Sequence, residues 1–158
     1  MCRCCALNAL EVKLQLINEK LKFSAKARSN PEFLIDYFPP LGDGEGYTSL
    51  EVFLSSFCSC ISSTVLTLLR AKMKKTISAV NVVAKGSVRE EHPKALTHIA
   101  VEMEITSPDV EESDVQAALT IAEEKLCPVW AMIKGNVEVT VHYRIIYITF
   151  IQKNIKKR

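Results

Sequence analysis

Residues Leu50–Ile61 read LEVFLSSFCSCI and open an apolar segment that extends to about Lys75. Thr48 or Ser49 stands at the start, where a hydroxyl can accept a hydrogen bond from the free N–H groups of a helix. The segment is long enough to cross a membrane. Glu51 and seven hydroxyl residues oppose that reading: Ser55, Ser56, Ser59, Ser62, Ser63, Thr64 and Thr67. We therefore predict a long helix at the centre of a packed core, and no membrane.

Before this helix, the sequence predicts a small sheet. Apolar and polar residues alternate over Leu10–Leu16 and again over Leu21–Arg28, and Asn18–Lys20 forms a turn between them, which is typical of a hairpin. Phe33–Tyr37 is a short third strand. Pro39–Gly46 is a loop, because its prolines and glycines interrupt regular structure.

After the helix, alternation predicts strands around Val80–Ala84 and Ile99–Ile105, joined by the charged connection Arg89–Lys94. Ser113 or an adjacent acid begins a further helix. Cys127-Pro128 interrupts it, since a residue before proline avoids helical angles, and Pro128 suits the first position of a short helix that ends near Gly135. Val137–Ile145 is the final strand. We expect the apolar residues 146–151 to be paired or buried, at a contact between subunits.

Strand runs separated by helices give an α+β fold. With 158 residues, one domain is expected, over 10–146, with a tail at 1–9 and an extension at 147–158 that ends in Lys153–Arg158. The formal net charge of +2, with charges interspersed, argues against nucleic acid as the main ligand. Uneven cysteine spacing and the absence of a signal-peptide pattern favour a reducing, cytoplasmic location.

Two cysteines are candidates for chemistry, and each has a structural alternative. Cys60 lies inside the apolar helix, where a free thiol commonly serves as a small hydrophobe. It would be reactive only beside a cation or N–H donors, and the sequence offers Arg28, Arg70 and Arg89 without choosing among them. Cys127 precedes the start of the short helix, whose free N–H groups would favour a thiolate; it could equally be a packing residue.

The other cysteines and the histidines are weaker candidates. Cys58 is rotated by about 200° from Cys60 on a helix, so we interpret it as packing. No second Cys or His cluster complements Cys2, Cys4 and Cys5, as a zinc site would require, so a frayed tail is the simpler reading. The three histidines, His92, His98 and His142, show no metal-ligand spacing, and we expect no metal or organic cofactor.

Three stretches together resemble the OsmC/Ohr family of thiol-dependent peroxidases, most closely its OsmC-like branch with YhfA-type proteins. They are GDGEGYTSLE at 42–51, which leads into the Cys60 helix, VREEHPKALTHI at 88–99, and AEEKLCPVWAMI at 122–133. With the order of elements, the resemblance covers about residues 10–145. It implies an intertwined homodimer whose antiparallel sheets wrap around long central helices.

The resemblance also assigns roles to residues. Cys60 corresponds to the cysteine that attacks a hydroperoxide and becomes a sulfenic acid, and Cys127 to the cysteine that resolves it as a disulfide. An external dithiol, in relatives often a lipoyl group, then reduces the disulfide. Arg28 is the candidate activating arginine and Glu51 the carboxylate that holds it. Family members carry that glutamate at the position of Leu50, one place earlier. The alternative is a non-enzymatic, dimeric OsmC-like protein that binds a ligand or senses redox state.

Overall fold

The computed structural model describes residues 10–148, which form two compact units divided between Phe53 and Leu54. The first unit contains a three-stranded antiparallel sheet in the order β1-β2-β3, formed by β1 (Lys13–Leu16), β2 (Phe23–Lys26) and β3 (Phe33–Ile35). The predicted hairpin and third strand are present, but each strand is shorter than the alternation indicated. The predicted tail at 1–9 and the end of the predicted extension lie outside the described residues.

Local polar contacts set these shorter limits. Asn18 Oδ1 accepts from the backbone N–H groups of Lys20 and Lys22 at 2.9 and 3.1 Å, which closes the predicted turn. Arg28 has φ of 56°, so β2 ends before it and the predicted strand end at Arg28 is wrong. Past β3, the buried Asp36 carboxylate accepts from the N–H groups of Asp43 and Glu45, both at 3.1 Å. These bonds fold the predicted loop back on itself.

A long helix follows this loop, and it changes from α-helical to π-helical near its end. The helix α1 (Ser49–Thr67) continues directly into the π-helical turn η2 (Leu68–Lys72). Phe57, Ile61 and Val65 recur every fourth residue and are buried, so one stripe of α1 faces a core. Within residues 10–148, Ser49–Lys72 is the one helical segment whose length and composition would permit a membrane crossing, and a buried core helix meets the same criteria.

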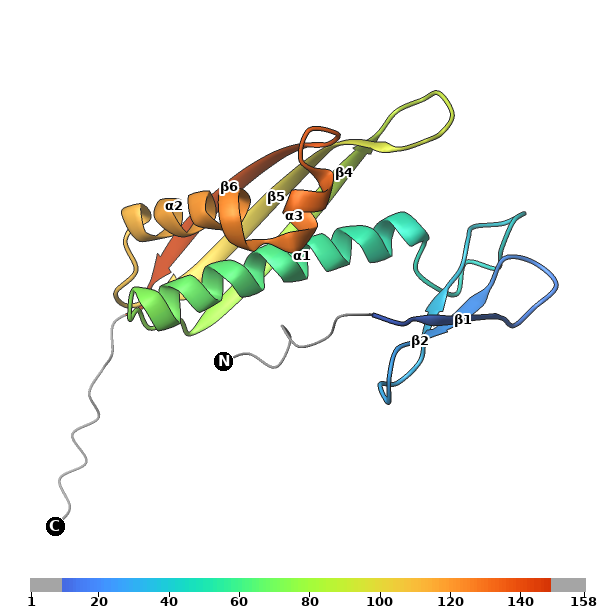
Figure 1. Cartoon of the computed structure of the whole chain (residues 1–158), viewed down its shortest axis with the longest axis horizontal. Coiled ribbons are helices and arrows are strands. Elements are labelled where there is room, and N and C mark those ends of the chain that lie inside the picture. Colours follow the sequence, from blue (N-terminus) through green and yellow to red (C-terminus); the bar gives the residue numbers. More distant parts are fainter. Residues whose placement is uncertain (1–9, 149–158) are drawn as a thin grey trace, which may run out of the picture. The chain divides into compact units, whose positions relative to one another are not determined.

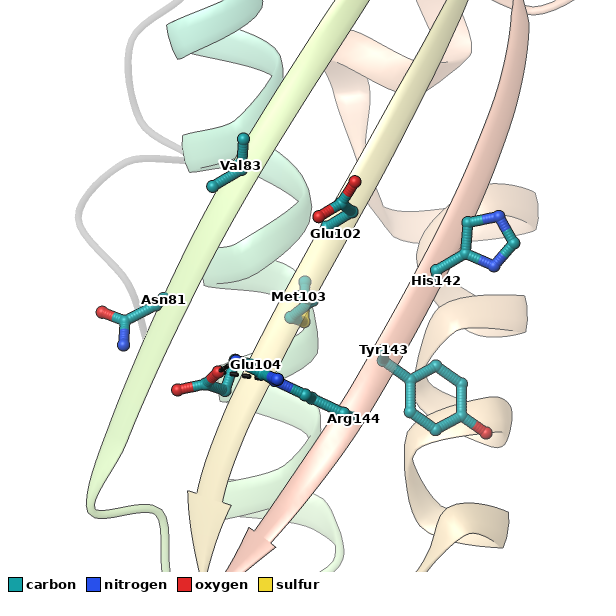
Figure 2. A pocket seen from close by; sticks show the side chains of 8 residues that line it. All are labelled: Asn81, Val83, Glu102, Met103, Glu104, His142, Tyr143 and Arg144. Atoms are coloured by element: carbon teal, nitrogen blue, oxygen red, sulfur yellow. Dashed lines mark hydrogen bonds and ion pairs between the residues drawn. The ribbon is translucent and has the colours of Figure 1, made fainter.

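The second unit contains the larger sheet, in the order β4-β5-β6, with β4 (Ala79–Val88), β5 (Leu96–Ser107) and β6 (Glu138–Tyr147). Between β5 and β6 the chain forms α2 (Glu112–Ile121), the π-helical turn η3 (Ala122–Leu126) and α3 (Pro128–Ile133). Figures 1 and 2 show the helices on one face of this sheet. Gly86 permits close packing there, because a Cβ on it would lie 3.2 Å from the Leu54 side chain of α1.

The predicted α+β class is confirmed, with one correction to the sheets. The β4–β5 pair is antiparallel, as expected, but β6 runs parallel to β5. The crossover through α2, η3 and α3 is the reason: it returns the chain to the end of the sheet at which β5 began. Ile146 and Tyr147 extend β6 and pair with Thr106 and Ser107, as predicted for the described part of the apolar end.

Candidate thiol site

Cys60 of α1 and Cys127 at the start of α3 lie with their sulfur atoms 3.0 Å apart, although 67 positions separate them in the chain. The Cys127 thiol donates to the Cys60 sulfur. Cys60 is half-buried, whereas Cys127 is only 2% exposed. A disulfide needs the sulfurs to approach to about 2.05 Å, so a movement of about 1 Å would join them.

The position of Cys127 follows from the break between two helices. The backbone N–H of Cys127 donates to Ala122 O at 2.9 Å and thereby closes the wide π-helical turn η3. Cys127 itself is extended, with φ −83° and ψ 105°, and Pro128 begins α3. The predicted interruption at Cys127-Pro128 is therefore present, since proline excludes helical angles at the preceding residue. The sequence patterns do not predict the π-helical turn at Ala122–Leu126.

An aromatic contact joins the same two helices beside the sulfurs. Phe57 and Trp130 meet edge to face, with ring centroids 5.7 Å apart and planes at 77°. Phe57 is fully buried and Trp130 nearly so. Such pairs contribute about 0.5–1.5 kcal/mol beyond the burial of their surface. Phe57 precedes Cys60 by three residues on α1, which places their side chains on one face of that helix. Trp130 lies on α3, three positions after Cys127, the residue that precedes this helix.

Burial decides the charge state of the Cys127 thiol. Burial, and next the neighbouring Cys60 sulfur, raise the pKa of Cys127 to about 11. The N–H groups of Trp130 and Val129 act in the opposite direction, as expected at a helix start, but they are outweighed. Our interpretation that this helix start would favour a Cys127 thiolate is therefore wrong, and Cys127 keeps its proton at neutral pH. Burial also raises the pKa of Cys58, in keeping with its predicted packing role.

Glu51 forms the start of α1. Its carboxylate accepts from the Thr48 backbone N–H at 2.7 Å and from the Thr48 hydroxyl at 2.9 Å. The Thr48 hydroxyl in turn accepts from the Glu51 N–H at 3.4 Å. This reciprocal arrangement is a capping box. Of the two residues predicted as the N-terminal cap, Thr48 and Ser49, it is therefore Thr48 that caps α1. The backbone hydrogen bond from Thr48, and then its hydroxyl, lower the pKa of Glu51.

The three candidate cations occupy different local settings. Arg28 stands in the turn after β2. Arg70 donates to Ile77 O at 3.1 Å, and Arg89 donates through Nε to Pro93 O. Within residues 54–148, neither Arg70 nor Arg89 donates to Cys60, and the Cys127 thiol supplies the hydrogen bond that the Cys60 sulfur accepts.

Two histidines lie on the face of the β4-β5-β6 sheet that points away from the helices. Figure 2 shows His142 there. His98 shares this face, since it lies an even number of positions before Glu102 on β5, and it bonds Thr140 Oγ1 at 3.0 Å. A depression of about 390 Å³ lies on this face (Figure 2), lined by Asn81, Val83, Glu102, Met103, Glu104, His142, Tyr143 and Arg144. Among the described residues, no group of three His, Cys, Asp or Glu side chains could hold a metal ion. Cys2, Cys4 and Cys5 lie outside them.

Similarity to known proteins agrees with this fold. The family model for OsmC-like proteins matches residues 42–142, which include both cysteines and most of the second unit. The chain therefore belongs to the OsmC-like protein family, as the three sequence stretches indicated.

Individual relatives extend the match over most of the chain. Protein YhfA of Escherichia coli is 27% identical over 81% of this chain and 92% of its own length. A hypothetical protein from Aquifex aeolicus VF5 has a TM-score of 0.78 and 26% identity, covering 90% of this chain and 100% of its own. An organic hydroperoxide resistance protein, OsmC, from Legionella pneumophila has a TM-score of 0.64 and 16% identity, covering 90% and 99%.

Proposed function

We propose that the protein is a cysteine-based hydroperoxide reductase in which Cys60 attacks the substrate and Cys127 resolves the product. The observation that carries the proposal is the 3.0 Å separation of the two sulfurs. The half-buried Cys60 is the more accessible of the pair, so it is the natural site of attack by a small oxidant. Membership of the OsmC-like family, with a hydroperoxide resistance protein among the structural relatives, supports this choice.

The proposed reaction has two covalent steps. The Cys60 thiolate forms a bond to one oxygen of the hydroperoxide, the O–O bond breaks, and its electron pair leaves on an alkoxide that becomes the alcohol. Cys60 is then a sulfenic acid. Cys127 attacks the Cys60 sulfur, hydroxide departs, and a Cys60–Cys127 disulfide remains. An external dithiol, such as a lipoyl group, returns both thiols by exchange. No metal or organic cofactor takes part.

The proposal includes a homodimer, and the first unit supplies a reason. Cross-strand partners share one face of a sheet, so the register of Leu14 with Ala25 and Leu16 with Phe23 places these apolar side chains together. Leu14 and Leu16 remain 56% and 50% exposed. We call this the β1–β2 apolar face. A second copy of the chain would cover it, since exposed apolar patches mark contact surfaces.

The residues proposed to activate Cys60 come from the resemblance to the family. The family pattern proposes Arg28 as the activating cation and Glu51 as the carboxylate that holds it. The cap formed by Glu51 leaves its side chain charged, because its pKa is lowered. We place the reaction in the cytoplasm, where the reductant and a reducing pool are available.

Disulfide mapping after peroxide treatment tests the proposal. Reduced protein is treated with equimolar cumene hydroperoxide or hydrogen peroxide, and its disulfides are identified by mass spectrometry. We expect a Cys60–Cys127 bond, together with peroxide consumption when dihydrolipoamide is present. Cys58→Ser is the matched control and keeps both results, whereas Cys60→Ser loses both. If wild-type protein forms no such bond and consumes no peroxide, the proposal is wrong.

One observation favours the alternative of a non-enzymatic, redox-sensing or ligand-binding protein. The family's glutamate position is occupied by Leu50, and the neighbouring Glu51 caps the helix. A sensor would form the Cys60–Cys127 disulfide without sustained turnover. Repeated peroxide additions in the presence of dihydrolipoamide separate the two, because only an enzyme consumes many equivalents.

A further inference from the structure

The hydrogen bond between the two thiols has a direction, and that direction has a chemical meaning. Cys127 donates and Cys60 accepts at 3.0 Å. A thiol is a weak donor towards a neutral acceptor, but a hydrogen bond to a charged acceptor is considerably stronger. The arrangement is therefore most favourable when Cys60 carries the negative charge and Cys127 carries the proton.

The surroundings of each sulfur support the same distribution of charge. Cys127 is 2% exposed, so a charge on it would be poorly solvated, whereas Cys60 keeps some contact with solvent. The charged residues of η3, the turn that precedes Cys127, are Glu123, Glu124 and Lys125, and Glu123 pairs with Lys134 at 3.4 Å. The groups that act on the Cys127 thiol are Cys60 and the N–H groups of Trp130 and Val129.

We propose that the Cys127 thiol is the hydrogen-bond donor that holds Cys60 as a thiolate, and that its proton is the one passed to the alkoxide when the O–O bond breaks. The second part rests on the proposed function. In that step the Cys60 sulfur gains an oxygen as sulfenic acid, the alkoxide gains the Cys127 proton and becomes the alcohol, and Cys127 is left as a thiolate. That thiolate then attacks the Cys60 sulfur and expels hydroxide. One proton thus couples attack to resolution.

Cys127→Ala and Cys127→Ser separate this role from packing. Both variants remove the resolving sulfur, but the serine hydroxyl can still donate to Cys60. The reaction of Cys60 with iodoacetamide in fully reduced protein, followed by peptide mass spectrometry against pH, reports the thiolate without peroxide. We expect Cys127→Ala to slow alkylation of Cys60 about tenfold at neutral pH, in keeping with the strength of hydrogen bonds to charged groups. Cys127→Ser should retain most of the wild-type rate.

Cys58 is an internal control in every sample, since its alkylation should not change between variants. Matching far-ultraviolet circular dichroism spectra of wild type, Cys127→Ala and Cys127→Ser show that all three proteins are folded. If Cys127→Ala unfolds, the Cys60 alkylation profiles of wild type and Cys127→Ser still test the proposal. In that case, the rate of Cys60 alkylation in Cys127→Ser is compared with the rate for a short unfolded peptide that contains Cys60. A rate in Cys127→Ser as low as that of the peptide would contradict the proposal, because the serine hydroxyl should preserve the hydrogen bond. Superimposable wild-type and Cys127→Ala profiles would overturn it.

A second measurement tests the transfer of the proton. With cumene hydroperoxide, the rate at which Cys60 sulfenic acid forms, trapped by dimedone, should fall in Cys127→Ala by more than alkylation does, because the alkoxide then lacks its donor. Equal falls in the two rates would refute proton transfer. The results separate this inference from the proposed function. If wild-type protein forms the disulfide but Cys127→Ala leaves the alkylation profile of Cys60 unchanged, this inference alone is refuted. If Cys127→Ala changes the profile but wild-type protein consumes no peroxide, the proposed function is refuted.

Discussion

Phe57 and Trp130 contact each other edge to face, 5.7 Å between ring centroids, and so join α1 to α3 beside the two cysteines. Phe57 lies three positions before Cys60 on α1, and Trp130 lies three positions after Cys127 on α3, so the contact holds the two helices together close to both cysteines. The separation of the sulfurs therefore depends on a pair of rings that take no part in the chemistry.

Phe57→Ala should lower the free energy of unfolding by about 3–5 kcal/mol, because a buried aromatic side chain is lost and a cavity remains. It should also slow formation of the Cys60–Cys127 disulfide, since the sulfurs lose their register. Urea unfolding and disulfide mapping measure the two effects, and Phe57→Leu gives a milder variant. Val65→Ala, also buried on α1, is the control: it should destabilise the protein without slowing the disulfide. Equal slowing in Val65→Ala would mean that stability alone sets the rate.

Glu51→Gln should leave the cap of α1 largely intact, because glutamine also accepts from the Thr48 N–H. If Glu51 helps to activate Cys60, as the family pattern proposes, loss of its charge should slow peroxide consumption with little change in unfolding free energy. Thr48→Ala is the converse control and should cost about 1 kcal/mol through loss of the cap. Steady-state peroxide consumption and urea unfolding distinguish them. Unchanged turnover in Glu51→Gln would leave Glu51 with its capping role only.

Stability of the reduced protein should fall in alkaline solution through Cys127. Its pKa is raised from the ordinary 9.0 to about 11 in the folded chain. Between these values the folded state keeps a proton that the unfolded chain has lost, so unfolding releases a proton and higher pH favours it. The contribution is complete below about pH 9 and is lost as the pH rises through about 11. Urea unfolding of wild-type protein against Cys127→Ala isolates it, since the lysines are common to both; parallel pH profiles would contradict the assignment.

Leu16→Glu should prevent self-association, because it puts a charge on the β1–β2 apolar face. Gln15→Glu is the matched control: neighbouring residues of a strand point to opposite faces, so it adds the same charge to the other side. Sedimentation velocity should show a dimer for wild-type protein and Gln15→Glu, and a smaller species for Leu16→Glu. A dimer that withstands Leu16→Glu would place the contact elsewhere, and a monomeric wild-type protein would end the proposal of a homodimer.

Much of the secondary structure can be predicted from the sequence, because it depends on residues that are close together in the chain. Within residues 10–148, alternation predicts β1, β2, β4, β5 and β6, and Pro128 predicts the break at Cys127, because both signals depend on near neighbours. Strand ends were less predictable: β2 stops before Arg28 through a backbone angle, and β3 stops before Asp36 because that side chain turns inward. The parallel pairing of β6 depends on where a crossover returns the chain, which alternation does not encode.

The candidate site divides in the same way. The pairing of Cys60 with Cys127 came from family resemblance, since each cysteine had an equally good packing interpretation. The sequence predicts the charge state of Cys127 in the wrong direction, because the tertiary fold sets its burial, and burial outweighs the effect of the helix start. The contribution of Phe57 and Trp130 could not be seen either, since nothing in the spacing brings α1 and α3 together.

The unequal burial of the two sulfurs also determines how an oxidised site would be reduced. In a Cys60–Cys127 disulfide, an incoming thiolate meets the half-buried Cys60 sulfur and must expel Cys127. A thiol whose pKa is about 11 is a poor leaving group, so exchange with simple monothiols is slow. The bond would therefore persist in a glutathione-like pool and yield to a dithiol, whose second sulfur traps the mixed disulfide before Cys127 can return.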